Sequence, residues 1–206
     1  MIAVIDYGAG NLFSLCSSLK SLGLAAKVTH SAADLQQASH LILPGVGAFG
    51  DAMQKLTATG LVPDICAQAQ AGKPLLGICL GMQLLFDTSH EYGTHAGLHL
   101  LQGEICPLED DLRAAGYAYK VPHMGWNALQ IKQPQNALLR NTKMGDSVYF
   151  VHSFYAKNCA ESIVATSEYG IDVPAVVAKN NVYGCQFHPE KSGRAGLAIL
   201  SAFAQI

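Results

Sequence analysis

The fold is decided by one stretch of the chain, Lys73-Pro74-Leu75-Leu76-Gly77-Ile78-Cys79-Leu80-Gly81-Met82-Gln83-Leu84-Leu85-Phe86. An apolar run typical of a buried strand passes directly into residues with helical spacing, and Cys79 lies at the junction among glycines. Such a sharp strand-to-helix turn carries the nucleophile in many hydrolases, and its strained backbone favours glycine neighbours. The N-terminus of the following helix would favour the reactive thiolate. This pattern alone leaves two interpretations of Cys79 open, a nucleophile and a small buried side chain.

Outside this stretch, the composition limits the classes of protein to consider. The chain has 206 residues, half of them apolar, and a formal net charge of −2. This length allows one sizeable domain, and we expect a single domain over residues 1–206. The near-neutral charge without a basic run disfavours nucleic-acid binding. The sequence contains no stretch of about 18 apolar residues, so we expect no membrane span. Six scattered cysteines and a strand-like N-terminus favour a protein with free thiols in the cytoplasm.

The first half of the chain alternates between strand and helix patterns. Apolar runs at 2–5, 25–29, 40–43 and 75–78 are separated by helical patterns at 12–22 and about 51–71. This order predicts a doubly wound, mostly parallel α/β sheet flanked by helices. Because ligands bind beyond the carboxyl ends of such strands, Asp6, Pro44–Gly47 and Cys79 should meet at one crevice. Gly8-Ala9-Gly10 lacks the third glycine of a dinucleotide-binding fingerprint, so a tight turn is favoured there.

The second half reads as an additional region of antiparallel strands. Short alternating runs follow residue 147, and the last, 182–187, leads into His188-Pro189-Glu190 and a closing helix at 196–203. His95 and His99 are four residues apart, but they lie among glycines without a zinc-binding motif. We therefore expect loop histidines there, and no metal site.

His188 and Glu190 supply what a catalytic thiol needs. In an extended segment, residues two apart point to the same side, so Glu190 could orient the His188 ring. With Cys79 they form a candidate nucleophile, base and orienter for acyl transfer. The tetrahedral oxyanion would need two donors, the N–H of Leu80 and an N–H of the Gly45-Val46-Gly47 loop, taken as that of Val46.

Three motifs together resemble those of the class I, triad-type glutamine amidotransferases: Gly77–Gln83, Pro44–Gly47 and Gln186–Ser192. Within that family, Asp6–Leu12, His123–Asn127 and Tyr149–Ser153 resemble the glutaminase subunits of imidazole glycerol phosphate synthase. The resemblance extends from Asp6 to Ser192. It implies that L-glutamine is hydrolysed to glutamate and ammonia through a Cys79 thioester, without a cofactor.

The resemblance also implies roles for individual residues. Cys79 would be the nucleophile, His188 the base and acid, and Glu190 the orienter, with Val46 and Leu80 forming the oxyanion hole. Contacts with the substrate are implied for Gly45, Gly47, Gln83, His152, Ser153 and Phe154. Contacts with a partner are implied for His123, Met124, Trp126, Asn127 and Lys191. A lone tryptophan is often a core residue and a lysine is often merely solvated, so those readings stay open for Trp126 and Lys191.

The implied partner is a separate (β/α)₈-barrel cyclase subunit in a heterodimer, which would receive the ammonia for histidine biosynthesis. A barrel needs about 250 residues, so this chain does not contain one. The family further implies a glutaminase that is nearly idle until the cyclase binds its substrate, and a turn of the Val46 peptide is a physical route to such a switch. Three alternatives remain: a glutaminase that serves pyridoxal phosphate synthesis, a non-catalytic regulatory subunit, and a peptidase or γ-glutamyl hydrolase.

Overall fold

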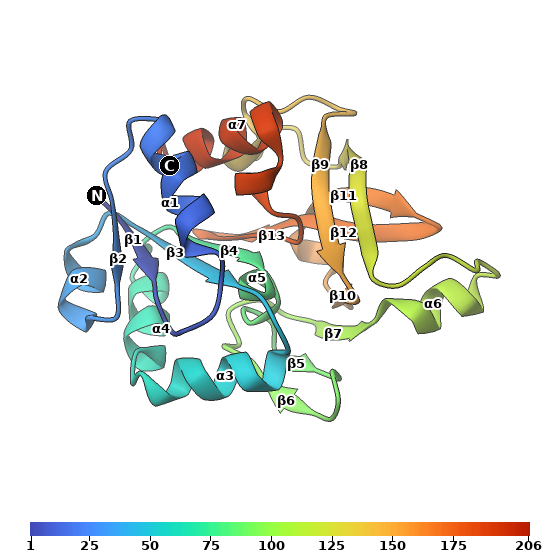
Figure 1. Ribbon diagram of the computed structural model, residues 1–206, viewed down its shortest axis with the longest axis horizontal. Helices are drawn as coiled ribbons and strands as arrows, with labels where there is room; N and C mark the ends of the chain where they lie inside the picture. Colours follow the sequence, from blue (N-terminus) through green and yellow to red (C-terminus); the bar gives the residue numbers. More distant parts are fainter.

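The computed structural model describes residues 1–206, and its centre is a nine-stranded sheet. Figure 1 shows this sheet running across the molecule, with helices on both faces. In spatial order the strands are β2 (Ala26–Thr29), β1 (Ile2–Ile5), β3 (His40–Gly45), β4 (Leu75–Cys79), β13 (Val182–Cys185), β12 (Ile171–Lys179), β11 (Ile163–Tyr169), β8 (His123–Ile131) and β9 (Ser147–His152).

The parallel part of the sheet brings the predicted site residues to one edge. Strand β4 lies between β3 and β13, and all three run in the same direction. The register pairs Gly45 with Cys79 and Cys185 with Ile78, so the three strands end side by side. The Gly45–Gly47 loop, Cys79 and the segment that begins at Gln186 therefore leave the sheet at neighbouring positions, as the order of the elements predicts.

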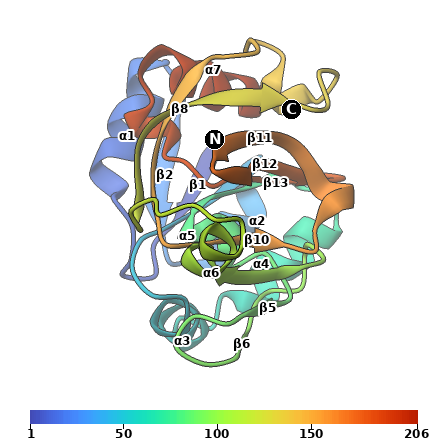
Figure 2. The same ribbon diagram turned by 90° about the vertical axis from the view of Figure 1, so that its right-hand side faces the viewer.

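Helices cover the two faces of the sheet and bury separate cores. Leu15 and Leu19 of α1 (Leu12–Ser21) pack with Ile199 and Phe203 of α7 (Gly193–Phe203) in a core of 23 residues. The opposite core has 26 residues and is covered by three further helices, which are α2 (Ala32–Gln37), α3 (Phe49–Ala58) and α4 (Val62–Gln70). Figure 2 shows α7 and α3 on opposite sides of the sheet. The predicted fold class, a doubly wound α/β sheet flanked by helices, is confirmed.

The antiparallel strands extend this same sheet. β13 pairs antiparallel with β12, and the antiparallel order continues through β11, β8 and β9. The turn at Asn180–Asn181 joins β12 to β13 with Asn180 at φ 55°, as expected for a hairpin. Helix α6 (Leu108–Ala114) lies at this end of the molecule, beyond the strands in Figure 1.

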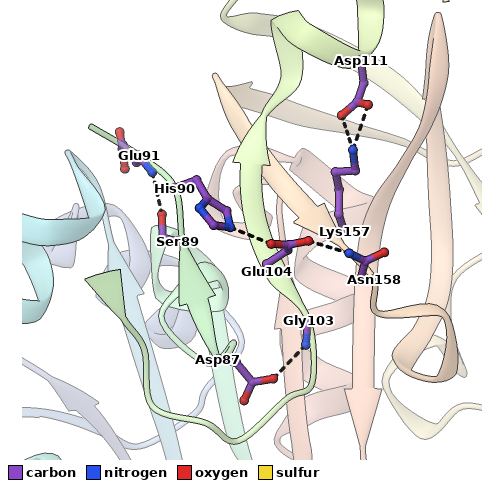
Figure 3. A network of polar contacts seen from close by, with 9 residues as sticks. All are labelled: Asp87, Ser89, His90, Glu91, Gly103, Glu104, Asp111, Lys157 and Asn158. Carbon is purple, nitrogen blue, oxygen red and sulfur yellow. Dashed lines mark hydrogen bonds and ion pairs between the residues drawn. The ribbon is translucent and has the colours of Figure 1, made fainter. Parts of the chain in front are cut away.

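A second, four-stranded sheet supports the strand that follows His152. Its order is β10 (Phe154–Lys157), β7 (Glu104–Pro107), β5 (Thr88–Ser89) and β6 (His95–Ala96). Figure 3 shows that Glu104 of β7 lies between His90 and Asn158, which bond its two carboxylate oxygens. Lys157 at the end of β10 bonds both carboxylate oxygens of Asp111 at 2.8 Å. These contacts fasten β5, β7, β10 and α6 to one another.

Two local details differ from the sequence-based expectations. The helical pattern after Cys79 gives only a four-residue helix, α5 (Leu80–Gln83), because Leu84, Leu85 and Phe86 turn away into the core that α3 and α4 cover. Likewise, Pro189–Lys191 form a 3₁₀ turn, η3, where an extended segment is expected. Two more 3₁₀ turns are η1 (Ala137–Leu139) and η2 (Ala160–Ser162). None of the helices has both the length and the apolar character needed to cross a bilayer.

Candidate active site

Cys79 occupies a strained elbow between β4 and α5. Its backbone has φ 54° and ψ −112°, in the region that side-chain-bearing residues rarely adopt. A Cβ on Gly81 would lie 1.8 Å from the Leu43 carbonyl oxygen, and one on Gly77 would lie 2.6 Å from the Gly81 carbonyl oxygen. Gly81 therefore allows the turn to pack against β3, and Gly77 allows the end of β4 to pack against the start of α5. Helix α5 is too short to develop a full dipole, so the contribution expected from a helix N-terminus is small.

His188 and Glu190 form a buried ion pair next to this elbow. His188 Nδ1 lies 2.8 Å from Glu190 Oε1, and both side chains are 3% exposed. The expected geometry, an extended segment with the two residues on one side, is wrong. Instead the 3₁₀ turn of η3 brings the carboxylate back to the ring. Ser192 fixes the turn, because its hydroxyl donates to the His188 carbonyl at 2.6 Å and accepts the Tyr149 N–H at 3.0 Å.

The surroundings of His188 favour a protonated ring. Burial opposes a charge on the imidazole, but hydrogen bonds to Cys79 and Glu190 outweigh that effect and raise the pKa of His188 to about 9. Near neutral pH, His188 therefore carries a proton between the Cys79 sulfur and the Glu190 carboxylate. A histidine held in this way can donate a proton to a leaving group.

A pocket of about 410 Å³ opens over Cys79 and His188. Its lining brings together most of the residues expected to contact the substrate or the oxyanion, namely Val46, Gly47, Leu80, Gln83, His152, Ser153 and Phe154. A hollow of similar volume, about 430 Å³, lies near Cys159. Burial raises the pKa of the Cys159 thiol to about 11, and no histidine lines that hollow. The pocket over Cys79 is therefore the candidate active site.

Gln83 lines the pocket with its donor atoms already in use. Its Nε2 atom donates to the Phe154 carbonyl at 3.0 Å and to Gln186 Oε1 at 3.1 Å. Only its oxygen is left free to accept a hydrogen bond from a substrate. Gln83 thus ties α5 to the start of β10 while it lines the pocket.

Gly45 does not line the pocket, contrary to the expectation that it contacts the substrate. It lies beneath the loop, where an added Cβ would be 2.6 Å from Tyr7 Oη and 2.8 Å from the Gly81 nitrogen. The Tyr7 hydroxyl donates to the Pro44 carbonyl at 2.9 Å and occupies the space that a side chain would need. The glycine is therefore explained by close packing under the loop, while Val46 and Gly47 reach the pocket.

The residues expected to face a partner fall into two groups. Met124 is 60% exposed and Trp126 is 56% exposed, so Trp126 is not a core residue. Lys191 is exposed and lies at the rim of the pocket, and Asn127 is half-buried. His123 is fully buried, stacked between the rings of Phe150 and Tyr169. A direct contact between His123 and a partner is therefore ruled out in this conformation, because side chains on β8 alternate between outside and inside.

The sequence reasoning missed Glu91, the only acidic side chain that lines the pocket. Its Oε2 atom accepts the Phe49 N–H at the start of α3 at 2.6 Å, and burial raises the pKa of its carboxyl group. Tyr92 follows it and also lines the pocket. Nothing in the local sequence marks Glu91, since it lies in a loop between two-residue strands.

The comparisons with known proteins agree with this architecture. The family model described as glutamine amidotransferase class-I matches residues 3–205, so the chain belongs to that family. A solved structure titled glutamine amidotransferase superimposes with a TM-score of 0.75 at 19% identity, covering 99% of this chain and 100% of that one. PurLQS from Thermotoga maritima gives a TM-score of 0.73 at 17% identity, covering 99% and 97%. At these identities, the likeness concerns the fold.

Curated relatives narrow the family further. The chain is 50% identical to imidazole glycerol phosphate synthase subunit HisH of Geobacillus sp. (strain WCH70), over 100% of this chain and 97% of that protein. It is 51% identical to the HisH subunit of Bacillus licheniformis, over 100% and 96%. It is 48% identical to that of Caldanaerobacter subterraneus subsp. tengcongensis, over 100% and 98%.

Proposed function

We propose that this chain is a single-domain glutaminase, residues 1–206, which hydrolyses L-glutamine to glutamate and ammonia as a subunit of imidazole glycerol phosphate synthase. The observation that carries the proposal is the buried His188–Glu190 pair beside a cysteine on a strained elbow, at the floor of a pocket. The identity with HisH subunits supports it, and so does the glutamine amidotransferase class-I family.

In the first half of the proposed reaction, the amide bond is broken. The proton of the Cys79 thiol resides on His188, as the raised pKa of the ring favours, and the thiolate attacks the amide carbon of the glutamine side chain. The backbone N–H of Leu80, aided by an N–H at Val46, stabilises the tetrahedral oxyanion. His188 protonates the leaving nitrogen, which departs as ammonia and leaves a thioester on Cys79. Glu190 keeps the ring oriented and balances its positive charge.

In the second half, water cleaves the thioester and regenerates the free Cys79 nucleophile. His188, neutral after it has protonated the amine, accepts a proton from water as the oxygen attacks the thioester carbon. The same donors stabilise the second oxyanion. Its collapse breaks the bond between carbon and sulfur, releases glutamate and restores the Cys79 thiolate beside protonated His188. No cofactor takes part in either half of this scheme.

The charges that line the pocket fit a free amino acid. The Glu91 carboxylate can bind the α-ammonium group of glutamine, and the backbone around Ser153 with Lys191 can meet its α-carboxylate. The free oxygen of Gln83 can accept a hydrogen bond from the substrate. A peptide bond at the α-amino group would remove the charge that Glu91 would bind, which favours free glutamine over a peptide.

The second subunit is proposed to be a (β/α)₈-barrel cyclase, with which this chain forms a heterodimer in the cytoplasm. Ammonia would pass through a channel to the cyclase and be used to form imidazole glycerol phosphate and an aminoimidazole carboxamide ribotide. Met124 and Trp126 offer exposed apolar surface for docking beside Asn127, and Lys191 is exposed at the pocket. Neither a nucleic acid nor a membrane surface is part of this proposal.

The Val46 loop is the proposed point at which the partner controls activity. Val46 is 45% exposed, and Gly47 follows it at φ 106°, a conformation in which its peptide can turn at little cost. Contacts with the cyclase would turn the loop so that an N–H points at the oxyanion. The isolated chain is then expected to turn over slowly, and a high glutaminase rate without a partner would contradict this part.

The central test compares Cys79→Ala with the wild-type chain, each mixed with a barrel cyclase and its nucleotide substrate. The variant should lose glutamine-dependent synthesis and keep synthesis from added ammonium. Loss of both would mean that Cys79 has a structural role, and full glutamine-dependent activity would rule it out as the nucleophile. Assays with γ-glutamyl peptides distinguish the alternative hydrolase, which would prefer them to free glutamine.

A further inference from the structure

A row of hydrogen-bonded groups runs beneath the pocket from its wall to the exposed side of β8. The Phe154 carbonyl lies 2.9 Å from His152 Nδ1, and His152 Nε2 lies 3.0 Å from His123 Nδ1. His123 Nε2 in turn lies 2.9 Å from Asn127 Oδ1, and Asn127 Nδ2 donates to the Glu168 carbonyl at 3.1 Å. The row therefore connects the start of β10 with a residue beside the exposed Met124 and Trp126.

A count of protons shows that the row cannot be complete with two neutral rings. A carbonyl oxygen and an amide oxygen close its two ends, and both are acceptors. Three contacts involve the rings and each needs a proton, whereas two neutral imidazoles supply only two. If the Asn127 amide is rotated by 180°, its Nδ2 atom donates to a bare His123 Nε2. Its Oδ1 atom then faces the Glu168 carbonyl oxygen, and both of these atoms are acceptors. One contact fails in every neutral arrangement.

Burial decides which contact gives way. His123 is 0% exposed and His152 is 6% exposed, so water cannot relieve two facing nitrogens that lack a proton. An unsatisfied buried polar group costs about 1–3 kcal/mol. Asn127 is only half-buried, so water can solvate its turned amide. The contact without a proton is therefore one made by Asn127. The contacts of His152 with the Phe154 carbonyl and with His123 stay the same in every low-energy arrangement.

We propose that His123 and Asn127 are positioning residues of the glutamine pocket, which hold His152 in the tautomer that donates its Nδ1 proton to the Phe154 carbonyl. His123 does so by donating its own Nδ1 proton to His152 Nε2. The same carbonyl accepts Gln83 Nε2 at 3.0 Å, and His152 and Phe154 both line the pocket. The row is completed at its outer end either by the turned Asn127 amide or by a second proton on His123. As a role in substrate binding, this inference rests on the proposed glutaminase function.

The charged groups nearby indicate that the extra proton belongs to His123. Burial lowers the pKa of His152 to about 3, aided by repulsion from His123 and from His188. Burial also lowers the pKa of His123, but its hydrogen bond to Asn127 acts in the opposite direction. The rings of Phe150 and Tyr169 stack on His123 with centroids at 4.7 and 4.0 Å, and such faces stabilise a cation.

The other titratable groups near the row lie around the pocket and on β11. Tyr169 is the titratable side chain packed on His123, whereas Cys79, Glu91, His188 and Lys191 share the pocket lining with His152. Protonated His188 disfavours a charge on His152 and leaves His123 as the site of uptake. His123 should therefore gain its second proton as the pH falls below the ordinary histidine range, while His152 stays neutral.

Two-bond proton–nitrogen NMR on the histidine-¹⁵N-labelled chain tests this inference between about pH 5 and 8. His152 should show a protonated Nδ1 and a bare Nε2 throughout. Asn127→Asp keeps an acceptor at His123 Nε2 and adds a negative charge, so it should raise the pKa of His123 by about 1. Asn127→Leu removes the acceptor and should lower that pKa. Gln130→Leu, which removes an amide from the same strand outside the row, should leave it unchanged.

Kinetics provide the second readout. Asn127→Leu should raise KM for glutamine up to about tenfold with a smaller change in kcat, and Asn127→Asp should shift the pH dependence of KM to higher pH. His123→Asn keeps a donor near the Nδ1 position and should retain more affinity than His123→Leu. A protonated His152 Nε2, or equal pKa shifts in the Asp and Leu variants, would overturn the proposal. The NMR result does not depend on activity, so an inactive but correctly titrating chain would refute only the proposed function.

Discussion

Glu190 holds His188 with one carboxylate oxygen and leaves the other without a partner. Oε1 lies 2.8 Å from His188 Nδ1, whereas Oε2 is buried and makes no hydrogen bond. The imidazole is therefore the only hydrogen-bonding partner of this carboxylate, which is unusual for a buried charged group. Such an arrangement makes the orientation and charge of the ring sensitive to any change at Glu190.

The amide Glu190→Gln tests this dependence directly. It keeps the shape of the side chain but removes its charge, and its NH₂ group can hold the wrong nitrogen of His188. We expect kcat for glutamine hydrolysis to fall by about 10²- to 10⁴-fold, measured in the presence of the cyclase, while use of added ammonium is unchanged. An unaltered rate would exclude Glu190 from the catalytic group.

The pH dependence of stability should also show the His188 interaction. The pKa of His188 is raised from 6.5 to about 9 in the folded chain, so the native state binds this proton more tightly than the unfolded state does. The resulting stabilisation is fully present below about pH 6.5 and is lost as the pH rises through 9, by at most about 3 kcal/mol. Denaturant unfolding across this range should show a decline, and the decline should be smaller in Glu190→Gln.

Gly81→Ala should disrupt the elbow. The added Cβ would lie 1.8 Å from the Leu43 carbonyl oxygen, which is backbone and has no room to move within the sheet. We expect a loss of more than about 3 kcal/mol in the free energy of unfolding. Gly60→Ala is the control, since Gly60 has φ 73° but nothing within 4 Å of its added Cβ, and should cost only about 1 kcal/mol. Gly81 has no positive φ, so equal effects would mean that close packing against Leu43 does not set the cost at Gly81.

Trp126→Ala should weaken the complex with the cyclase. The side chain is 56% exposed beside Met124, so it has apolar surface to bury when a partner docks. Loss of such an aromatic anchor typically costs about 2 kcal/mol or more in binding, which titration calorimetry against the cyclase can measure. Met144→Ala provides the control, because Met144 is 65% exposed but is not among the residues implied to contact the partner. If both variants bind equally well, Trp126 lies outside the interface.

Glu91→Gln should impair recognition of the substrate. The carboxylate is the only acidic group lining the pocket, and its replacement removes the partner proposed for the α-ammonium group of glutamine. Loss of a charge-assisted hydrogen bond of about 1.5–3 kcal/mol should raise KM roughly tenfold or more. Glu109→Gln, at an exposed ion pair on α6, should leave KM unchanged. A shift of kcat alone would place Glu91 outside substrate binding.

Much of the fold follows from patterns that are short-range in the sequence. Alternation of apolar runs with helical spacing is a local property, and it predicts the parallel strands β1 to β4 and the helices between them. Because parallel strands end at one edge, the same pattern brings Cys79, the Val46 loop and His188 together before any contact is known. The sharp turn at Cys79, with its φ of 54°, also belongs to this local stretch, and Gly77 lets it close on Gly81.

The features that the sequence did not predict depend on contacts between distant segments. The path from His188 to Glu190 depends on Ser192, whose hydroxyl accepts the Tyr149 N–H of β9 and donates to the His188 carbonyl, so the 3₁₀ turn could not be predicted from His-Pro-Glu alone. Glu91 reaches the pocket because Phe49, 42 residues earlier, offers its N–H. His123 is buried because β11 supplies a tyrosine ring, although the motif implies a partner contact.

The sequence by itself therefore determined the class of fold and the chemical groups at the candidate site. Backbone periodicity and residue chemistry are local properties of the sequence. Because parallel strands end at the same edge of the sheet, these local patterns also predict that the residues following the strands lie together. Only the tertiary structure decided which of those groups are buried, which hydrogen bonds they share and where their protons lie. Those properties depend on neighbours brought close by the packing of both sheets, and the His123–His152 contact between β8 and β9 is one of them.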